Sequence, residues 1–117
     1  DMPASLAFYR ALGLDIRAGM DQEGHVEAAL PGGLRLAWDT YETMRSFQPD
    51  WQPPTGSQGI SLAFLCEGPA EVDALFEQLT GMGHPPHLAP FDAFWGQRYA
   101  SVLDPDGNVV DLFAPLP

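Results

Sequence analysis

The residues best suited to chemistry stand close together near the C-terminus, in the segment 95–113, WGQRYASVLDPDGNVVDLF. At its centre, residues 104–108 have the composition of a hairpin loop, because proline presets φ, glycine permits positive φ, and Asp and Asn bond their own backbone. In the strand that follows, alternation places Asp111 on the opposite face from its two apolar neighbours. A carboxylate is therefore expected to point from a sheet face near Trp95 and Tyr99. It could ligate a metal ion or orient a bound molecule, depending on the other polar side chains of that face.

The elements that position this segment follow a regular order in the second half of the chain. A strand is expected at 60–66, followed by a helix at 69–82, where apolar residues recur at helical spacing and a glycine ends the pattern. Three more strands are expected at about 87–90, 97–103 and 109–113. The order is therefore β-α-β-β-β.

The first half looks like the same unit without its first strand. A helix capped by Asp1 is expected to end near Gly13, followed by strands at 14–17, 25–30 and 34–39. A short helical piece near 41–46 precedes a connector rich in proline. We expect one domain, with a first module at about 1–47, a connector at about 48–58 and a second module at about 59–117. Because an exposed sheet edge invites aggregation, we expect that the missing strand reflects truncation of the sequence.

Composition limits the possible partners. The net charge is −11, from 16 acidic and 5 basic residues, which argues against nucleic acid and anionic membranes as partners. It is compatible with a neutral or cationic small ligand, and equally with a general role in solubility. No apolar run has the length of a membrane helix, and no signal-peptide pattern opens the chain. The single Cys66 excludes an internal disulfide framework and favours a reducing cytoplasm.

Several sequence motifs, taken together, resemble those of one superfamily. FYRALGLDI, the helix ended by glycine, and the DPDGN hairpin resemble the vicinal oxygen chelate superfamily of glyoxalase I, extradiol dioxygenases and bleomycin-resistance proteins. The resemblance implies an α+β fold in which two βαβββ modules form a curved mixed sheet around a concave cavity. GLRLAWDT, WQPPTG and WGQRYA, followed by DPDGNVVDLFAPLP, are similar to the mitomycin-binding resistance proteins within it. Those proteins bind a planar antibiotic non-covalently and are not enzymes acting on it.

The metal site of the superfamily's enzymes is not reproduced in this sequence. The resemblance implies one ligand from each of four strands, and the first of these strands is absent. Arg35 occupies the position of a ligating Glu, and Gln58 or Gly59 that of a ligating His. Only Asp111 remains, and one carboxylate near a guanidinium does not hold a divalent ion. We therefore expect no metal, no cofactor and no enzymatic activity, and an ion pair between Arg35 and Asp111.

Alternation also predicts which side chains face the helices. They are Val26, Ala28, Leu30, Leu34, Leu36, Trp38, Ile60, Leu62 and Phe64. The opposite face combines small residues, charges, a histidine and aromatic rings, and Trp95 joins it if the backbone stays extended through Gly96. A concave face that binds a ligand explains this mixture, and a dimer interface on the same face is the competing explanation.

The resemblance implies that Trp95 and His25 hold a flat, conjugated drug between them. Trp95 could instead be a hydrophobic plug, and His25 a surface residue at a strand end. Tyr99 is expected to add a wall and a hydroxyl bond, while Arg35 holds the acids in place. Polar residues expected to orient the drug are Asp39, Asp111, Glu27 and Gln97, and aromatic residues expected to cover it from the connector side are Phe47 and Trp51.

These expectations define a function and its alternatives. The predicted function is sequestration of a planar aromatic or quinone antibiotic, such as a mitomycin, a quinoline-bearing peptide or a bleomycin-like compound, by a cytoplasmic protein that confers drug resistance. The family's small members commonly dimerise, so a homodimer with cavities shared between protomers is expected. The alternatives are a metal-dependent glyoxalase or dioxygenase-type enzyme and a carrier that delivers the drug to an exporter.

Overall fold

A computed structural model describes residues 1–55 and 60–117 of the chain. These residues form two compact units, Asp1–Thr55 and Gly56–Pro117, which we call the first and the second unit. Both combine helices with strands, and the sheet of the second unit is mixed, which confirms the predicted α+β class. Within the described residues no helix is long and apolar enough to cross a membrane.

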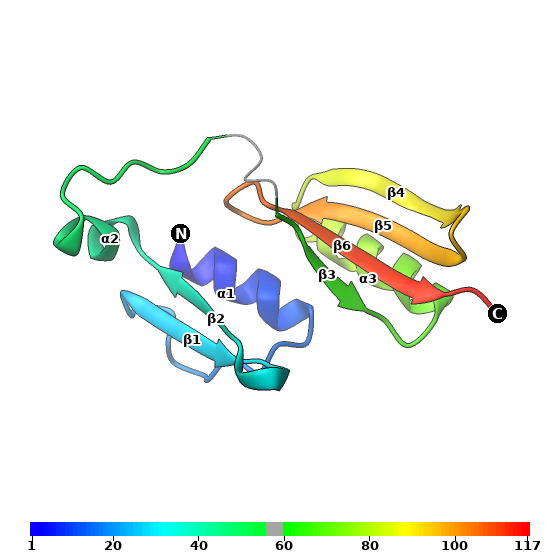
Figure 1. The fold of residues 1–117 in the computed structure, drawn as a ribbon, viewed down its shortest axis with the longest axis horizontal. Coiled ribbons are helices and arrows are strands. Elements are labelled where there is room, and N and C mark those ends of the chain that lie inside the picture. Colours follow the sequence, from blue (N-terminus) through cyan, green and yellow to red (C-terminus); the bar gives the residue numbers. More distant parts are fainter. Residues whose placement is uncertain (56–59) are drawn as a thin grey trace. The chain divides into compact units, whose positions relative to one another are not determined.

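The second unit has the predicted β-α-β-β-β order (Figure 1). Its elements are β3 (Leu62–Leu65), α3 (Pro69–Gly81), β4 (Pro86–Ala93), β5 (Gln97–Leu103) and β6 (Val109–Pro115). The strands lie in the order β3-β6-β5-β4, with β3 parallel to β6 and the other neighbours antiparallel. Strand β6 is therefore central, and its side chains alternate between the two faces of the sheet.

Helix α3 covers one face of this sheet. Val72 and Leu79 of α3 are fully buried, as are the small and branched residues of the strands on that side, which are Ala100, Val102, Val110, Leu112 and Ala114. The Arg98 guanidinium reaches Asp73 of α3, with Nε 2.9 Å from Oδ1, so Arg98 shares this face. Residues one position away in the same strands, including Tyr99 and Asp111, must then lie on the other face.

The predicted hairpin between β5 and β6 is confirmed in detail. One carboxylate oxygen of Asp104 accepts hydrogen bonds from the backbone N–H groups of Asp106 and Asn108, at 2.9 and 2.8 Å. The other oxygen accepts from the side-chain amide of Asn108 at 2.9 Å. Gly107 has a φ of +83°, a conformation that costs a glycine little. This turn fixes the register in which β5 pairs with β6.

The first unit contains α1 (Met2–Ala11), β1 (His25–Ala29), a 3-10 turn at Pro31–Gly33, β2 (Arg35–Asp39) and α2 (Tyr41–Phe47). The Asp1 side chain caps α1 by accepting from the Ala4 N–H at 3.0 Å, as predicted. Strands β1 and β2 are antiparallel. Val26 and Ala28 are buried at 3% exposure while their neighbours are exposed, so the predicted alternation in β1 is confirmed.

Three expectations for the apolar residues are wrong. Residues 14–17 form no strand, because their amides bond locally: the Leu14 N–H donates to Tyr9 O and the Ile16 N–H to Leu14 O. Leu34 is 67% exposed instead of buried, since it stands at the turn where the β1–β2 ribbon reverses. Ile60 is 80% exposed, because β3 begins only at Leu62 and the alternating pattern does not extend back to it.

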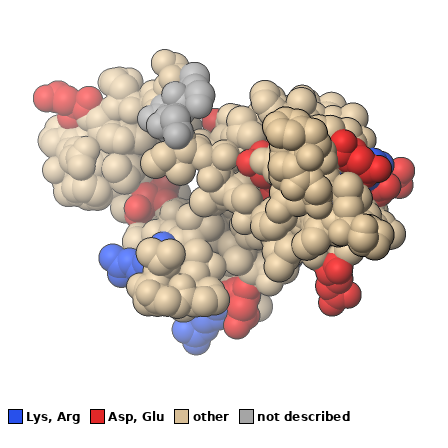
Figure 2. All heavy atoms as spheres, turned by 45° about the vertical axis from the view of Figure 1, so that its right-hand side comes forward, with Lys and Arg blue, Asp and Glu red and all other residues tan. Residues whose placement is uncertain are grey.

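The surface reflects the acidic composition of the chain. Figure 2 shows Asp and Glu side chains at more places on the visible face than Arg side chains. The sequence contains 16 acidic and 5 basic residues, and all five basic residues are arginines. A bound cation therefore finds many carboxylates, whereas an anion finds few partners.

Candidate functional site

On the face of the second unit that α3 does not cover, the central residue is Asp111 of β6. Its side chain is buried, with 8% exposure, and it lies directly opposite Ser101 in the β5–β6 ladder. The Ser101 hydroxyl donates to Oδ1 at 2.6 Å, and the Ser61 hydroxyl donates to Oδ2 at 3.2 Å. The Tyr99 hydroxyl also hydrogen-bonds this carboxylate. Three neutral hydroxyl groups thus converge on one buried carboxylate.

This arrangement changes the acidity of Tyr99. Burial, which disfavours the phenolate, is the larger cause, and the bond to Asp111 and its negative charge add to it, raising the pKa of Tyr99 to about 12. The phenol therefore remains protonated at neutral pH and acts as a hydrogen-bond donor. It is poorly suited to act as a base.

Aromatic rings surround Tyr99 on the same face. The ring centroid of Trp95 lies 5.3 Å from that of Tyr99, and that of Phe91 lies about equally far from both, at 6.2 Å from Trp95 and 6.1 Å from Tyr99. All three pairs meet edge to face, which is a favourable geometry for aromatic rings. The Trp95 indole N–H donates to Oε1 of Gln97 at 2.8 Å, and its side chain is 48% exposed. A large, fixed aromatic surface is thereby left open to a partner.

The backbone reaches Trp95 by a different route from the one expected. Gly96 has a φ of +91°, so the chain turns there and does not stay extended into β5. The Gly96 N–H closes this turn on Ala93 O at 3.0 Å. Trp95 joins the face through its side-chain contacts with Tyr99 and Gln97, and not through strand alternation.

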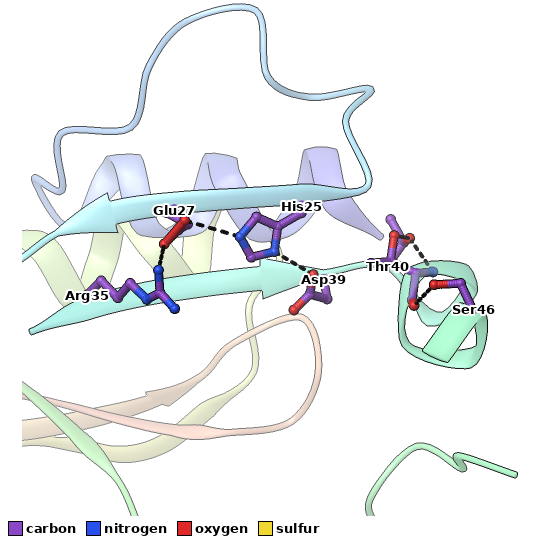
Figure 3. Close-up of polar contacts among 7 residues, drawn as sticks. His25, Glu27, Arg35, Asp39, Thr40 and Ser46 are labelled. Atoms are coloured by element: carbon purple, nitrogen blue, oxygen red, sulfur yellow. Dashed lines mark hydrogen bonds and ion pairs between the residues drawn. The ribbon is translucent and has the colours of Figure 1, made fainter. Parts of the chain in front are cut away.

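The first unit carries a second polar cluster on β1 and β2 (Figure 3). His25 lies opposite Asp39 in the ladder, and its Nδ1 is 2.6 Å from Oδ1 of Asp39. Its Nε2 is 3.3 Å from Oε1 of Glu27, whose other oxygen is 2.8 Å from Nη1 of Arg35. The bond to Asp39, followed by that to Glu27, raises the pKa of His25. Both ring nitrogens are therefore placed to donate to carboxylates from an imidazolium ion.

The two aromatic residues expected to cover the ligand have different surroundings. Phe47, at the end of α2, is 61% exposed. Trp51 packs on Tyr41 of α2, with ring centroids 5.1 Å apart, and the Arg45 guanidinium lies 5.8 Å from the centre of each ring. Trp51 is thus held against α2 by stacking and cation–π contacts. The spacing of Tyr41 and Arg45, one helical turn apart, could have indicated this cluster from the sequence.

Eight of the ten predicted site residues fall into one cluster in each unit, whereas Phe47 and Trp51 lie at α2 and belong to neither cluster. The predicted contact of a drug with both His25 and Trp95 joins residues of different units, and it stays a prediction. The same holds for an ion pair between Arg35 and Asp111. Within its own unit Arg35 pairs with Glu27, and Asp111 accepts from hydroxyl groups.

Sequence reasoning assigned no role in the site to the two serines that bind Asp111. Ser101 could have been found, because the DPDGN hairpin fixes the register that places it opposite Asp111. Ser61 could not have been found, because it lies just before β3, far from Asp111 in the sequence.

A metal ion of the kind used by the superfamily's enzymes does not fit the described residues. Asp111 accepts from three hydroxyl groups, and the ring nitrogens of His25 face carboxylates. Gln58 and Gly59, which align with a ligating His, lie outside the described residues. Among the residues that are described, no three His, Cys, Asp or Glu side chains are arranged to hold a metal ion.

Cys66 is also poorly suited to chemistry. Its side chain is buried, and burial, with a smaller contribution from the charge of Glu71, raises the pKa of the thiol. The reactive thiolate form is therefore disfavoured.

Comparison with known proteins identifies the family. The model of the Glyoxalase/Bleomycin resistance protein/Dioxygenase superfamily matches residues 1–112, and the chain belongs to this superfamily. No curated protein matches the chain.

Solved structures resemble the chain over nearly its whole length. A glyoxalase/bleomycin resistance protein/dioxygenase from Nocardioides is 27% identical with a TM-score of 0.69, covering 99% of this chain and 77% of that one. Protein ATC0852 from Agrobacterium tumefaciens is 25% identical with a TM-score of 0.69, covering 99% and 89%. A glyoxalase-related enzyme from Fulvimarina pelagi, 20% identical with a TM-score of 0.78 and covering 97% and 80%, shares the fold.

Proposed function

We propose that this protein binds a planar aromatic or quinone antibiotic without chemical change and thereby confers resistance to it. The observation that carries this proposal is the half-exposed indole of Trp95, which is fixed beside Tyr99 and Phe91 on the face that contains Asp111. The resemblance of several phrases, including WGQRYA around Trp95, to the mitomycin-binding resistance proteins supports this proposal.

Trp95 is suited to this role because it is already held in place. Its N–H bonds Gln97, and the edges of neighbouring rings contact it, so little rotamer freedom remains to be lost when a ligand binds. A flat ring stacked on the exposed indole gains about 0.5–1.5 kcal/mol beyond the burial of apolar area. Tyr99, Gln97 and Asp111 supply polar groups beside that plane.

His25 provides the second wall in this proposal. Its ring is bonded to Asp39 at one nitrogen and to Glu27 at the other, which fixes its plane on the β1–β2 face. We propose that Trp95 and His25 contact opposite faces of the same drug, in cytoplasmic homodimers whose cavities are shared between protomers.

The state of the polar groups supports binding more than catalysis. A general base needs a free lone pair at a proton-accepting atom. The nitrogens of His25 face carboxylates and Tyr99 remains protonated, so neither of these side chains is set up as a base. Residues arranged in this way can hold and orient a ligand with their existing hydrogen bonds.

Tryptophan-fluorescence titration tests the proposal. The purified protein would be titrated with a mitomycin, a quinoline-bearing peptide antibiotic and a bleomycin, each with and without added divalent metal ion, and with a non-planar antibiotic as control. We expect saturable quenching by at least one planar drug at micromolar concentration or below, independent of metal, and recovery of the drug unchanged. Binding that needs metal, or recovery of an altered drug, would contradict sequestration and favour a metal-dependent enzyme.

A further inference from the structure

The second unit is strongly acidic, and its single basic residue is already paired. Arg98 is the only Lys or Arg in residues 56–117, which contain eight Asp and Glu residues. The Arg98 guanidinium bonds both oxygens of Asp73, at 2.9 and 3.3 Å, and Oδ1 of Asp92 at 3.1 Å. Arg98 also lies on the face covered by α3. An anionic group bound near Trp95 would therefore find no basic side chain available in this unit.

Asp111 is a buried carboxylate on the face that α3 does not cover, and its partners among the described residues of 60–117 are neutral. Its hydrogen-bond donors are the hydroxyl groups of Ser61, Ser101 and Tyr99, none of which carries a positive charge. A carboxylate offers about four acceptor positions, so three hydroxyl donors leave room for one more. A buried charge is also stabilised strongly by an opposite charge that comes close to it.

The aromatic rings next to Asp111 attract the same kind of group. The face of an aromatic ring carries partial negative charge and binds cations within about 6 Å of its centre. Tyr99 links the two features, because its hydroxyl bonds Asp111 and its ring contacts Trp95. A cation placed beside the Tyr99 ring would thus be attracted by both the ring and the carboxylate.

We propose that the face formed by Trp95, Tyr99 and Asp111 selects planar ligands that carry a cationic group, such as a protonated amine, next to the ring system. The flat part stacks on Trp95, and the ammonium group donates to Asp111 beside the Tyr99 ring. This inference rests on the proposed binding function and specifies, in addition, that the bound ligand carries a positive charge. It distinguishes cationic ligands from neutral and anionic ones of the same shape.

Three probes with one ring system test the proposal on the unmodified protein. They are aminomethyl-anthracene, hydroxymethyl-anthracene and anthracene carboxylate, titrated by tryptophan fluorescence at low and high salt. We expect the ammonium probe to bind about tenfold more tightly than the neutral one, as a charge-assisted hydrogen bond allows, and the carboxylate probe to bind most weakly. Added salt is expected to weaken only the binding of the ammonium probe.

Two matched variants assign the preference to Asp111. Asp111→Asn keeps the shape of the side chain and removes its charge, so the ratio between the ammonium and neutral probes is expected to fall to about one. Glu77→Gln, an exposed position on α3, removes the same charge from the same unit and is expected to keep the ratio. The three probes are compared on the unmodified protein, so the proposal can be tested even if the Asp111→Asn variant folds poorly.

The possible outcomes distinguish a failure of this charge preference from a failure of the proposed binding function. Equal affinities for all three probes, or a charge preference that Asp111→Asn retains, would overturn the inference while leaving aromatic binding intact. Absence of quenching by every probe, together with absence of binding by the planar drugs, would overturn both.

Discussion

The hydroxyl group of Ser101 lies 2.6 Å from Oδ1 of Asp111, directly across the ladder between β5 and β6. Both residues are buried, with 1% and 8% exposure. A buried carboxylate needs such donors, because without them the loss of its hydration is not compensated. The pair therefore contributes both to the stability of the second unit and to the polarity of its candidate binding face.

Replacement of Ser101 by alanine is expected to destabilise the protein by about 1–3 kcal/mol, because it removes a donor from a buried charged acceptor. The measurement is urea unfolding followed by circular dichroism. Ser46→Ala is the matched control, since Ser46 is exposed and its hydroxyl bonds only a backbone carbonyl in its own helix. A cost for Ser101→Ala no greater than that of the control would show that the hydrogen bond contributes little.

Replacement of Trp95 by alanine is expected to weaken drug binding by about 1–3 kcal/mol, as is typical for a central aromatic contact. The unfolding midpoint is expected to change little, because about half of the side chain is exposed. Trp95→Phe keeps a ring but loses the N–H bond to Gln97, so an intermediate affinity is expected. Isothermal titration calorimetry measures these affinities without using tryptophan emission. Equal affinities for the alanine variant and the natural protein would rule out stacking on Trp95.

Titration of His25 by NMR is expected to give a pKa above its ordinary value of 6.5, because Asp39 and Glu27 both stabilise the imidazolium ion. Asp39→Asn is expected to lower this pKa more than Glu27→Gln does, since the bond to Asp39 is the larger cause. A folded-state pKa raised in this way adds stability that is complete below pH 6.5 and is lost as the pH rises through the raised value. If the two variants left the pKa unchanged, the cluster in Figure 3 would not exist in solution.

Tyr99 is expected to ionise with a pKa of about 12, compared with 10 in an unfolded chain. Between these two values the unfolded state loses the proton before the folded state does, so the folded protein becomes less stable as pH rises. Ultraviolet difference spectroscopy of the natural protein and Tyr99→Phe isolates this ionisation. Asp111→Asn is expected to lower the pKa, by removing a charge and a hydrogen bond that favour the phenol. Ionisation of Tyr99 near pH 10 in the natural protein would contradict its burial beside Asp111.

Asp104 is expected to be the most sensitive residue of the β5–β6 turn. Asp104→Ala leaves two backbone N–H groups and an amide without their acceptor, at an expected cost of about 1–3 kcal/mol. Asp104→Asn keeps one oxygen that can accept and is expected to cost less. Thermal unfolding of the two variants compares these effects. An equal loss in both would indicate that the charge, and not the number of acceptors, is important.

Local signals in the sequence predicted the second unit well. The Asp, Pro, Gly and Asn residues of 104–108 have strong turn preferences, and the apolar spacing at 69–82 indicated a helix with little dependence on the rest of the chain. The positions of Asp111 and Tyr99 on one face followed from alternation alone.

Other features depend on contacts that no local pattern contains. Residues 14–17 have the composition of a strand, but their amides bond to nearby carbonyl groups instead. The turn at Gly96 carries Trp95 out of the strand, and a glycine permits this turn but does not by itself distinguish it from an extended backbone. The pairing of Arg35 with Glu27 arises from the register of β1 and β2, which brings these two long side chains together. From the sequence alone, Asp111 was an equally suitable acidic partner for Arg35.

The sheets of the two units differ in the number of strands that protect their amides. In the described residues β1 pairs only with β2, whereas β6 has a neighbour on each side within a four-stranded sheet. A two-stranded ribbon opens more readily than a larger sheet packed on a helix, so amides of β1 should exchange with deuterium sooner than those of β6. If a drug contacts His25 as proposed, exchange is expected to slow most in β1, because the drug adds contacts to that ribbon. Protection of the β1 amides would thus report whether the face that carries His25 is occupied.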